Sequence, residues 1–268
     1  MPAVNRKRRI VQIGVFCFML AVPILNLLEI YFIKGSFISL GIGSLGIADP
    51  VMILQALIAS GSLSGVLVIS TLIPILVSFF FGRVWCSWAC PYTLILECIE
   101  KIPLVAGKMR VKHTKLRADG TLNRAFIVRN LIFLTLLFFV GVCGTPILYL
   151  FSPPAVISTQ AMLLVKNLTF TAELLFIAAL LIVEVFVSYR FVCRYLCPTG
   201  SCLSFVKSSA RLRVSYSGSC SGCRRCVRVC PMGLDPTKEA EHSLCFNCGE
   251  CIIACKERSL TWNIGLGK

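Results

Sequence analysis

The chain has 268 residues, of which 57% are hydrophobic, and its mean hydropathy is +0.84. This composition excludes an ordinary soluble globular protein and indicates a membrane protein. The formal net charge is +15, but no nucleic-acid motif or aromatic-interleaved basic surface accompanies it, so we expect no nucleic-acid partner. The Lys and Arg residues are better explained as markers of cytoplasmic loops.

Four apolar stretches have the roughly 20 residues that a helix needs to cross a bilayer core. They are residues 10–33, 62–81, 131–151 and 168–187. The positive-inside rule places the basic run 5–9 in the cytoplasm, together with the loop 83–129, which has nine Lys and Arg. An even number of crossings then leaves both termini in the cytoplasm, and we predict a multi-pass protein of the bacterial inner membrane.

The segment 37–60 is also apolar, but Asp49-Pro50 divides it into pieces too short to cross a bilayer. A span here would also move the basic loop to the outer side of the membrane. We therefore predict a re-entrant or interfacial segment. Pro153-Pro154 opens a similar short apolar segment before the fourth predicted span.

The cytoplasmic ends of the second and fourth predicted spans carry the same motif, Cys-x3-Cys-Pro. One copy contains Cys86 and Cys90, the other Cys193 and Cys197, and an arginine upstream aligns as well. The repeat predicts two helical hairpins related by a pseudo-two-fold axis along the membrane normal. Cysteines four residues apart share one face of a helical turn, which the proline ends or kinks, so both pairs could converge on one site.

These four cysteines have two interpretations. Small thiols are often buried for packing alone. The duplication favours a redox or metal role, which could be a third iron–sulfur cluster, a dithiol/disulfide pair or a copper(I) site, because soft thiolates suit all three. The remaining cysteines of the apolar region have no partner spacing and we assign them no such role; they are Cys17, Cys98, Cys143 and Cys202.

Residues 207–268 carry two runs of the form Cys-x2-Cys-x2-Cys-x3-Cys, the spacing of bacterial ferredoxins with two 4Fe-4S clusters. Three close thiolates bind one cluster and the fourth binds the other. This crossing assigns to the first cluster Cys220, Cys223, Cys226 and Cys255. It assigns to the second cluster Cys245, Cys248, Cys251 and Cys230. A zinc site fits less well, because it needs four ligands, usually as two separated pairs.

The predicted fold is an all-α membrane domain, residues 1–206, followed by a small α+β ferredoxin domain, residues 207–268. The membrane domain has four transmembrane helices arranged as two pseudo-symmetric hairpins. We expect no haem, because the two histidines, His113 and His242, lie outside the predicted spans and no Cys-x-x-Cys-His run occurs.

These features together resemble the NapH type of ferredoxin-like quinol dehydrogenase subunit, within a broader NapH/MauN-like superfamily. The resemblance rests on the basic N-terminus, residues 48–55, both Cys-x3-Cys-Pro motifs and both cluster motifs. It implies that the protein oxidises menaquinol or ubiquinol and sends electrons toward a periplasmic reductase, nitrate reductase in the first instance. It also implies a periplasmic ferredoxin-type partner subunit, and that the eight cysteines assigned above are cluster ligands.

Two carboxylates lie inside predicted spans, where a charge is costly and often functional. Because quinol oxidation releases protons together with electrons, Glu29 and Glu184 are candidate proton acceptors. The alternatives are that Glu29 reaches the interface from a helix end and that Glu184 pairs with an arginine such as Arg190.

A second hypothesis makes the repeated cysteines the active site. Here the protein is a maturation factor, and electrons from the clusters reduce copper or a disulfide bound at Cys86, Cys90, Cys193 and Cys197. A copper-handling assembly factor of cytochrome oxidase shares the Cys-x3-Cys-Pro motif. Copper(I) that is retained by the protein and lost after Cys-to-Ser replacement would favour this hypothesis.

Overall fold

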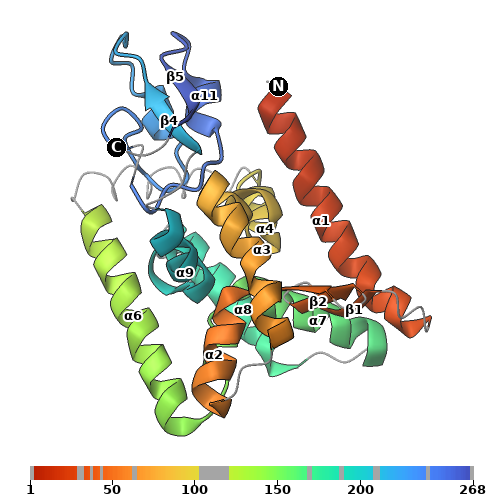
Figure 1. The fold of residues 1–268 in the computed structure, drawn as a ribbon. Helices are drawn as coiled ribbons and strands as arrows, with labels where there is room; N and C mark the ends of the chain where they lie inside the picture. The colour runs from red at the N-terminus through yellow and green to blue at the C-terminus, as the bar shows by residue number, and fades with distance from the viewer. Residues whose placement is uncertain are drawn as a thin grey trace.

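The computed structural model describes residues 3–28, 33–36, 39–42, 45–61, 65–102, 121–167, 171–186, 190–207, 212–239 and 242–265. A helical body makes up most of the molecule, and a module of short strands and helices lies at one end of it (Figure 1). Glu29, His113 and Arg211 lie outside the described residues.

The body is built from eight α-helices in the described ranges. They are α1 (Ala3–Leu27), α2 (Pro50–Ser60), α3 (Gly65–Phe81), α4 (Pro91–Ile99), α6 (Thr121–Cys143), α7 (Pro153–Asn167), α8 (Ala172–Phe186) and α9 (Pro198–Lys207). Two π-helices, η1 (Trp85–Ala89) and η3 (Val192–Leu196), join α3 to α4 and α8 to α9. The short 3-10 helix η2 (Ile147–Tyr149) follows α6.

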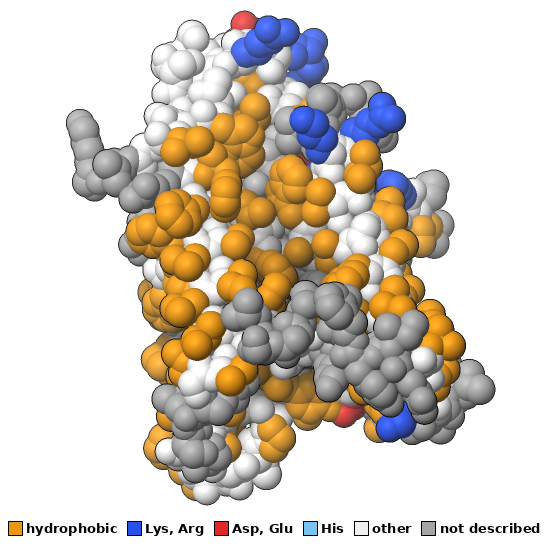
Figure 2. Space-filling model, turned by 45° about the vertical axis from the view of Figure 1, so that its right-hand side comes forward, with side chains coloured by type: hydrophobic (Ala, Val, Ile, Leu, Met, Phe, Trp, Pro, Cys, Tyr) orange, Lys and Arg blue, Asp and Glu red, His pale blue; other side chains and the backbone are white. Residues whose placement is uncertain are grey.

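Two helices in the described ranges are long and apolar enough to cross a membrane, Asn5–Leu27 within α1 and Ala125–Cys143 within α6. Only 22% and 17% of their apolar windows are buried. Phe138 of α6, for example, is 75% exposed. Hydrophobic side chains cover the middle of one face of the molecule, and most Lys and Arg side chains lie toward one end (Figure 2). Exposed apolar surface of this extent favours a membrane location.

The second and fourth predicted spans correspond to α3 and α8, which have 17 and 15 residues. At 1.5 Å per residue they extend roughly 26 and 22 Å, less than the roughly 30 Å hydrocarbon core. The first and third predicted spans are shifted. Helix α1 runs from Ala3 to Leu27, whereas residues 10–33 were predicted, and α6 runs from Thr121 to Cys143, whereas residues 131–151 were predicted. A mostly helical, membrane-type body is therefore present, and the arrangement of four full spans stays a prediction.

The apolar segment 37–60 is interrupted at Asp49-Pro50, as expected. The Asp49 carboxylate accepts a hydrogen bond from Val51 N at 2.9 Å, which caps α2. Pro50 occupies the first helical position, where its missing N–H costs little. The residues before the interruption are strands, however, so the prediction of an all-α body was wrong here.

The strands form an antiparallel sheet of order β1-β2-β3, comprising β1 (Ile33–Ser36), β2 (Ser39–Ile42) and β3 (Leu45–Ala48). The register pairs Ile33 with Ile42 and Leu40 with Ile47. Each strand has four residues, and an apolar run this short is equally compatible with a helix. The sheet was missed for that reason.

The two copies of the repeated motif adopt the same order of elements, α3–η1–α4 and α8–η3–α9. Cys90 N donates to Trp85 O at 3.0 Å, and Cys197 N donates to Val192 O at 2.8 Å. These bonds span five residues, so each cysteine pair lies on a π-turn and not on the expected α-turn; π-turns frequently mark functional sites. The prolines that follow, Pro91 and Pro198, begin α4 and α9 instead of ending a helix.

The C-terminal module contains strands β4 (Leu212–Tyr216) and β5 (Leu260–Ile264) and helices α10 (Arg225–Arg228) and α11 (Glu250–Ala254). The strands pair antiparallel and join the two ends of the module. The N-terminal end of α1 lies at the same end of the molecule (Figure 1). An ion pair of 2.6 Å between Arg8 of α1 and Glu250 of α11 connects them. The start of α1 and the module thus lie at the same end of the molecule, and the placement of both termini in the cytoplasm stays a prediction.

Candidate iron–sulfur and four-cysteine sites

One pocket of the C-terminal module is lined by the four cysteines assigned to the second cluster. Its empty volume is about 420 Å³, and apolar side chains such as Met232 and Leu234 complete its wall; the cysteines are Cys230, Cys245, Cys248 and Cys251. Burial, together with the nearby Cys230, raises the pKa of the Cys248 thiol to about 12. A buried set of thiols needs positive charge to ionise, which the iron of a cluster supplies. The pocket therefore fits a cubane cluster.

The cysteines assigned to the first cluster lie at the outer side of the module. Cys226 and Cys255 pack around Val214, Val227 and Leu260. Burial raises the pKa of Cys226, and the charges of Cys220 and Cys255 act in the same direction. Cys220 and Cys223 are exposed.

The structure places Cys230 in the pocket of the second run and packs Cys255 against the same core as Cys226, and the crossed assignment of ligands stays a prediction. Within the described ranges, no group of three or more His, Cys, Asp or Glu side chains has the geometry of a single-metal site. A cubane binds its thiolates through four separate irons, so they lie farther apart than the ligands of one zinc ion. The donor set suits a cluster better than a single ion.

The four cysteines of the repeat line one pocket in the body, with an empty volume of about 310 Å³; they are Cys86, Cys90, Cys193 and Cys197. Burial, together with the nearby Cys86 and Cys193, raises the pKa of Cys90 to about 12. Burial also raises the pKa of Cys197 to about 12. We refer to this space as the four-cysteine pocket. Soft sulfur donors from both repeat copies meet in it, which suits copper(I), a cluster or a dithiol.

The four-cysteine pocket and the pocket of the second cluster share one wall. Phe246, which is 2% exposed, lines both. The repeat cysteines pack against the same hydrophobic cluster as Cys230, Cys245 and Cys248.

Two buried arginines tie this part of the body to the module. Arg83 donates to Leu244 O at 3.3 Å and to Cys86 Sγ at 3.9 Å, and its guanidinium lies 5.1 Å from the centre of the Phe246 ring. Arg194 donates to Pro231 O at 3.4 Å. Buried guanidinium groups beside thiols stabilise negative charge at sulfur.

The internal repeat in the sequence indicates only part of this arrangement of arginines. The repeat aligns Arg83 with Arg190, but Arg190 pairs with Glu100 at 3.2 Å, whereas Arg194 takes the position beside the module. Gly200 leaves room for Arg83, because a Cβ at this residue would lie 2.8 Å from its Nη2. The alignment therefore identified one of the two arginines.

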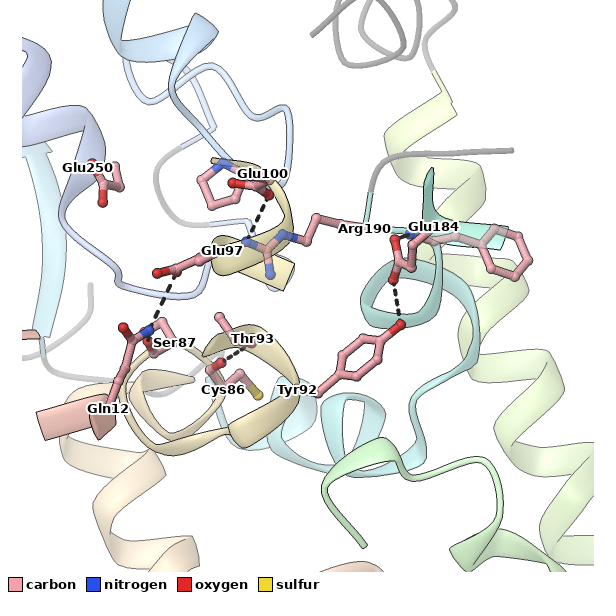
Figure 3. A network of polar contacts seen from close by, with 12 residues as sticks. Gln12, Cys86, Ser87, Tyr92, Thr93, Glu97, Glu100, Glu184, Arg190 and Glu250 are labelled. Atoms are coloured by element: carbon pink, nitrogen blue, oxygen red, sulfur yellow. Dashed lines mark hydrogen bonds and ion pairs between the residues drawn. The ribbon is translucent and has the colours of Figure 1, made fainter. Parts of the chain in front are cut away.

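Glu184 is fully buried and accepts three hydrogen bonds (Figure 3). The donors are Phe191 N at 2.8 Å, Val192 N at 3.1 Å and Tyr92 Oη at 3.2 Å. Tyr92 belongs to the first copy of the repeat and the backbone donors to the second. Glu184 thus connects the two copies and fixes the start of η3, and its proton role stays a prediction.

The first copy is held by α1 (Figure 3). Gln12 Nε2 donates to Ser87 O at 2.9 Å, and Arg8 pairs with Glu97 at 3.3 Å. Ser87 Oγ donates in turn to Phe246 O at 2.9 Å. Gln12 and Ser87 were not predicted as site residues, since neither residue type signals a site in a sequence.

His242 has a local structural contact. Its Nδ1 accepts a hydrogen bond from Leu244 N at 3.1 Å, in the loop before Cys245. Asn247 anchors the same loop to the body through Nδ2, which donates to Phe81 O at 2.7 Å and to Leu212 O at 2.9 Å. The loop that carries the second cluster motif is therefore fixed on both sides.

Comparison with known proteins relates the chain to ferredoxin-type proteins. Residues 63–112 and 170–213 match the family described as a 4Fe-4S binding domain. These two stretches contain the two Cys-x3-Cys-Pro copies, whereas the eight cysteines of the module lie outside them. The match supports an iron–sulfur protein and the internal repeat.

Several curated proteins are similar over most of the chain. The methylamine utilization ferredoxin-type protein MauN of Methylobacillus flagellatus is 29% identical over 72% of this chain and 64% of its own length. The ferredoxin-type protein NapH of Escherichia coli is 26% identical over 82% and 77%, and NapH of Haemophilus influenzae is 24% identical over 94% and 86%. No solved structure matches. The resemblance predicted from the motifs is confirmed: the chain is similar to the NapH and MauN proteins of the ferredoxin type, at 24–29% identity.

Proposed function

We propose that the chain is a membrane-bound electron-transfer subunit that oxidises quinol and relays the electrons through cysteine-bound iron–sulfur clusters. The observation that carries this proposal is the shared wall at Phe246 between the four-cysteine pocket and the pocket of Cys230, Cys245, Cys248 and Cys251. When bound, 4Fe-4S clusters accept and release one electron at a time. Electron transfer needs such redox sites in close succession.

The residues of the chain have distinct roles in this proposal. The eight cysteines of the module hold two clusters, and the four-cysteine pocket holds a further redox centre or metal. Arg83 and Arg194 place positive charge beside the thiols and fix the module on the body. Glu184 holds η3 and, in the proposal, receives a proton from quinol oxidation.

The topology in the proposal has four spans at α1, α3, α6 and α8, with both termini in the cytoplasm. The ion pair between Arg8 and Glu250 supports the same side for both ends. Electrons pass toward a periplasmic reductase through a periplasmic ferredoxin-type partner. Nitrate reductase is the proposed acceptor because of the resemblance to the NapH type, whereas the MauN relatives carry methylamine utilization in their names.

A second candidate function follows from the donor set of the four-cysteine pocket. One buried and three partly buried cysteines line this pocket, and soft thiolates are ligands that copper(I) prefers. A maturation factor would use electrons from the module to reduce copper or a disulfide held there. Copper(I) retained by the purified protein, and lost after replacement of Cys90 and Cys197 by Ser, would establish this function.

The test of the main proposal is anaerobic. A menaquinol analogue is added to the oxidised, purified protein, and the clusters are followed by electron paramagnetic resonance. Signals of reduced clusters are expected with the quinol alone. If dithionite reduces the clusters and the quinol does not, the dehydrogenase proposal fails for the isolated chain and the maturation function takes its place.

Iron content tests the number of clusters. Two cubanes contain about 8 irons per chain, and a third cluster at the four-cysteine pocket would raise the total to about 12. A content of about 8 in anaerobically purified protein would exclude a third cubane and leave the pocket to copper or to dithiol chemistry.

A further inference from the structure

A second pocket in the body lies beside the four-cysteine pocket and has an empty volume of about 400 Å³. Its apolar walls come from elements that are distant in sequence, with Pro74 in α3, Trp85 in η1, Pro154 in α7 and Leu203 in α9. Rigid proline and flat indole surfaces suit a planar ring.

Two polar side chains mark one side of this pocket. Thr199 Oγ1 donates to Asp49 Oδ2 at 2.8 Å, and Val51 N donates to Asp49 Oδ1 at 2.9 Å. Ser152 Oγ shares a further hydrogen bond of 3.0 Å with Thr199. These bonds fix the carboxylate in one orientation. Each carboxylate oxygen has two lone pairs, so acceptor capacity is left for a hydroxyl group in the pocket.

The pocket adjoins the proposed redox centre. Pro154 lines both this pocket and the four-cysteine pocket. Trp85 directly precedes Cys86, and Thr199 directly precedes Gly200, which lines the other pocket. A ring bound here would therefore lie next to the four-cysteine pocket.

The lining chemistry selects the class of ligand. The described residues around this pocket include a carboxylate and a hydroxyl but no Lys or Arg, so a phosphate or carboxylate ligand would be repelled. A neutral aromatic ring with hydroxyl groups matches apolar walls that have one acceptor and one hydroxyl at the side.

We propose that this pocket binds the ring of a membrane hydroquinone, with one ring hydroxyl hydrogen-bonded to Asp49 and the ring packed between Trp85 and the prolines. The inference rests on the proposed quinol oxidation and gives it a donor site. It assigns to Asp49 and Thr199 a ligand-binding role in addition to the cap of α2.

Binding of a fluorescent hydroxyquinoline N-oxide, a quinol mimic, to the full chain in detergent tests the site. Asp49→Asn keeps an N-cap side chain but removes the charge, and the loss of a hydrogen bond to a charged acceptor should weaken binding about tenfold or more. Leu203→Phe fills the pocket from the apolar side and should weaken binding as well. Lys166→Gln, at the exposed end of α7, is the matched control and should bind like the wild type.

Iron content and the visible absorbance of the clusters show whether each variant is folded. If Asp49→Asn lacks clusters, Leu203→Phe and Thr199→Val decide the question. Weaker binding in the pocket variants alone supports the inference. Wild-type affinity in all folded pocket variants would place the quinol site elsewhere and overturn the inference, while the proposed function would stand. Absence of binding to the wild type would overturn both.

Discussion

The two groups of cysteine sites differ in what surrounds them. At the outer side of the module, Cys220 and Cys223 are exposed. In the four-cysteine pocket, Cys193 is buried and the other thiols are partly buried beneath the module. A redox centre exchanges electrons with a partner only where the partner can approach, so the outer cluster suits exchange with another protein. The enclosed pocket suits transfer within the chain or chemistry protected from water.

This difference predicts unequal consequences when a ligand is removed. Cys248→Ser removes a thiol from the pocket of the second cluster, and we expect loss of about 4 of about 8 irons together with a loosened module, because Cys248 packs in the core cluster shared with the body. Cys223→Ser should also lose about 4 irons but leave the module in place, since Cys223 is exposed. Iron analysis and limited proteolysis between α9 and β4 measure both effects.

Equal protease resistance of the two iron-depleted variants would contradict the comparison. It would show that the second cluster does not help to hold the module on the body. The exposed Lys256→Met variant serves as the control for both measurements and should keep its full iron content.

The contact between the two regions depends on Arg83. Arg83→Met removes hydrogen bonds to Ser243 O and Leu244 O and the contact with the Phe246 ring, and it leaves buried carbonyl oxygens without a donor. We expect a loss of about 2–4 kcal/mol in the free energy of unfolding. Thermal unfolding in detergent, compared with Lys256→Met, measures this loss. An unchanged midpoint would show that the arginine does not hold the module.

The sequence revealed the module more fully than the body, and locality explains why. Three of four ligands in each cluster motif lie within seven residues of chain, so their spacing alone predicts the chemistry. The meeting of Cys90 with Cys193 depends on the packing of two distant repeat copies. The duplication pointed to it, but the π-turns, Tyr92 and the Arg194 contact were not readable from residue types.

In the membrane body, too, only features with a strong local sequence preference could be predicted. Asp49-Pro50 was readable as an interruption because each residue has a strong local preference at a helix start. The four-residue strands before it could not be predicted, because the sequence of β1–β3 has no pattern that separates a strand from an apolar helix. Likewise α8 begins at Ala172, later than the apolar stretch 168–187 suggested, because hydropathy gives no helix start.

A smaller effect is expected at Glu184, which joins the two repeat copies. Glu184→Gln keeps one carbonyl acceptor but loses the charged acceptor for Phe191 N and Val192 N, so stability should fall by about 1–3 kcal/mol while both clusters stay bound. If the carboxylate also receives a proton, quinol oxidation slows while iron content is unchanged. Glu173→Gln, at the other end of α8, is the control. A wild-type oxidation rate would exclude the proton role.

The smallest effect concerns protonation in the enclosed pocket. Burial raises the pKa of Cys90 and of Cys197 from 9.0 to about 12, so in iron-free protein these thiols stay protonated at a pH where exposed thiols ionise. Because the folded pKa lies above the unfolded one, this contribution to stability is complete below about pH 9 and is lost as the pH rises toward 12. At pH 9.5, iodoacetamide should therefore alkylate the exposed Cys98 well before Cys90 or Cys197, as peptide mass analysis would show. Equal modification of all three would mean that the pocket is open to solvent, and the enclosed region would then be no better protected than the outer cluster.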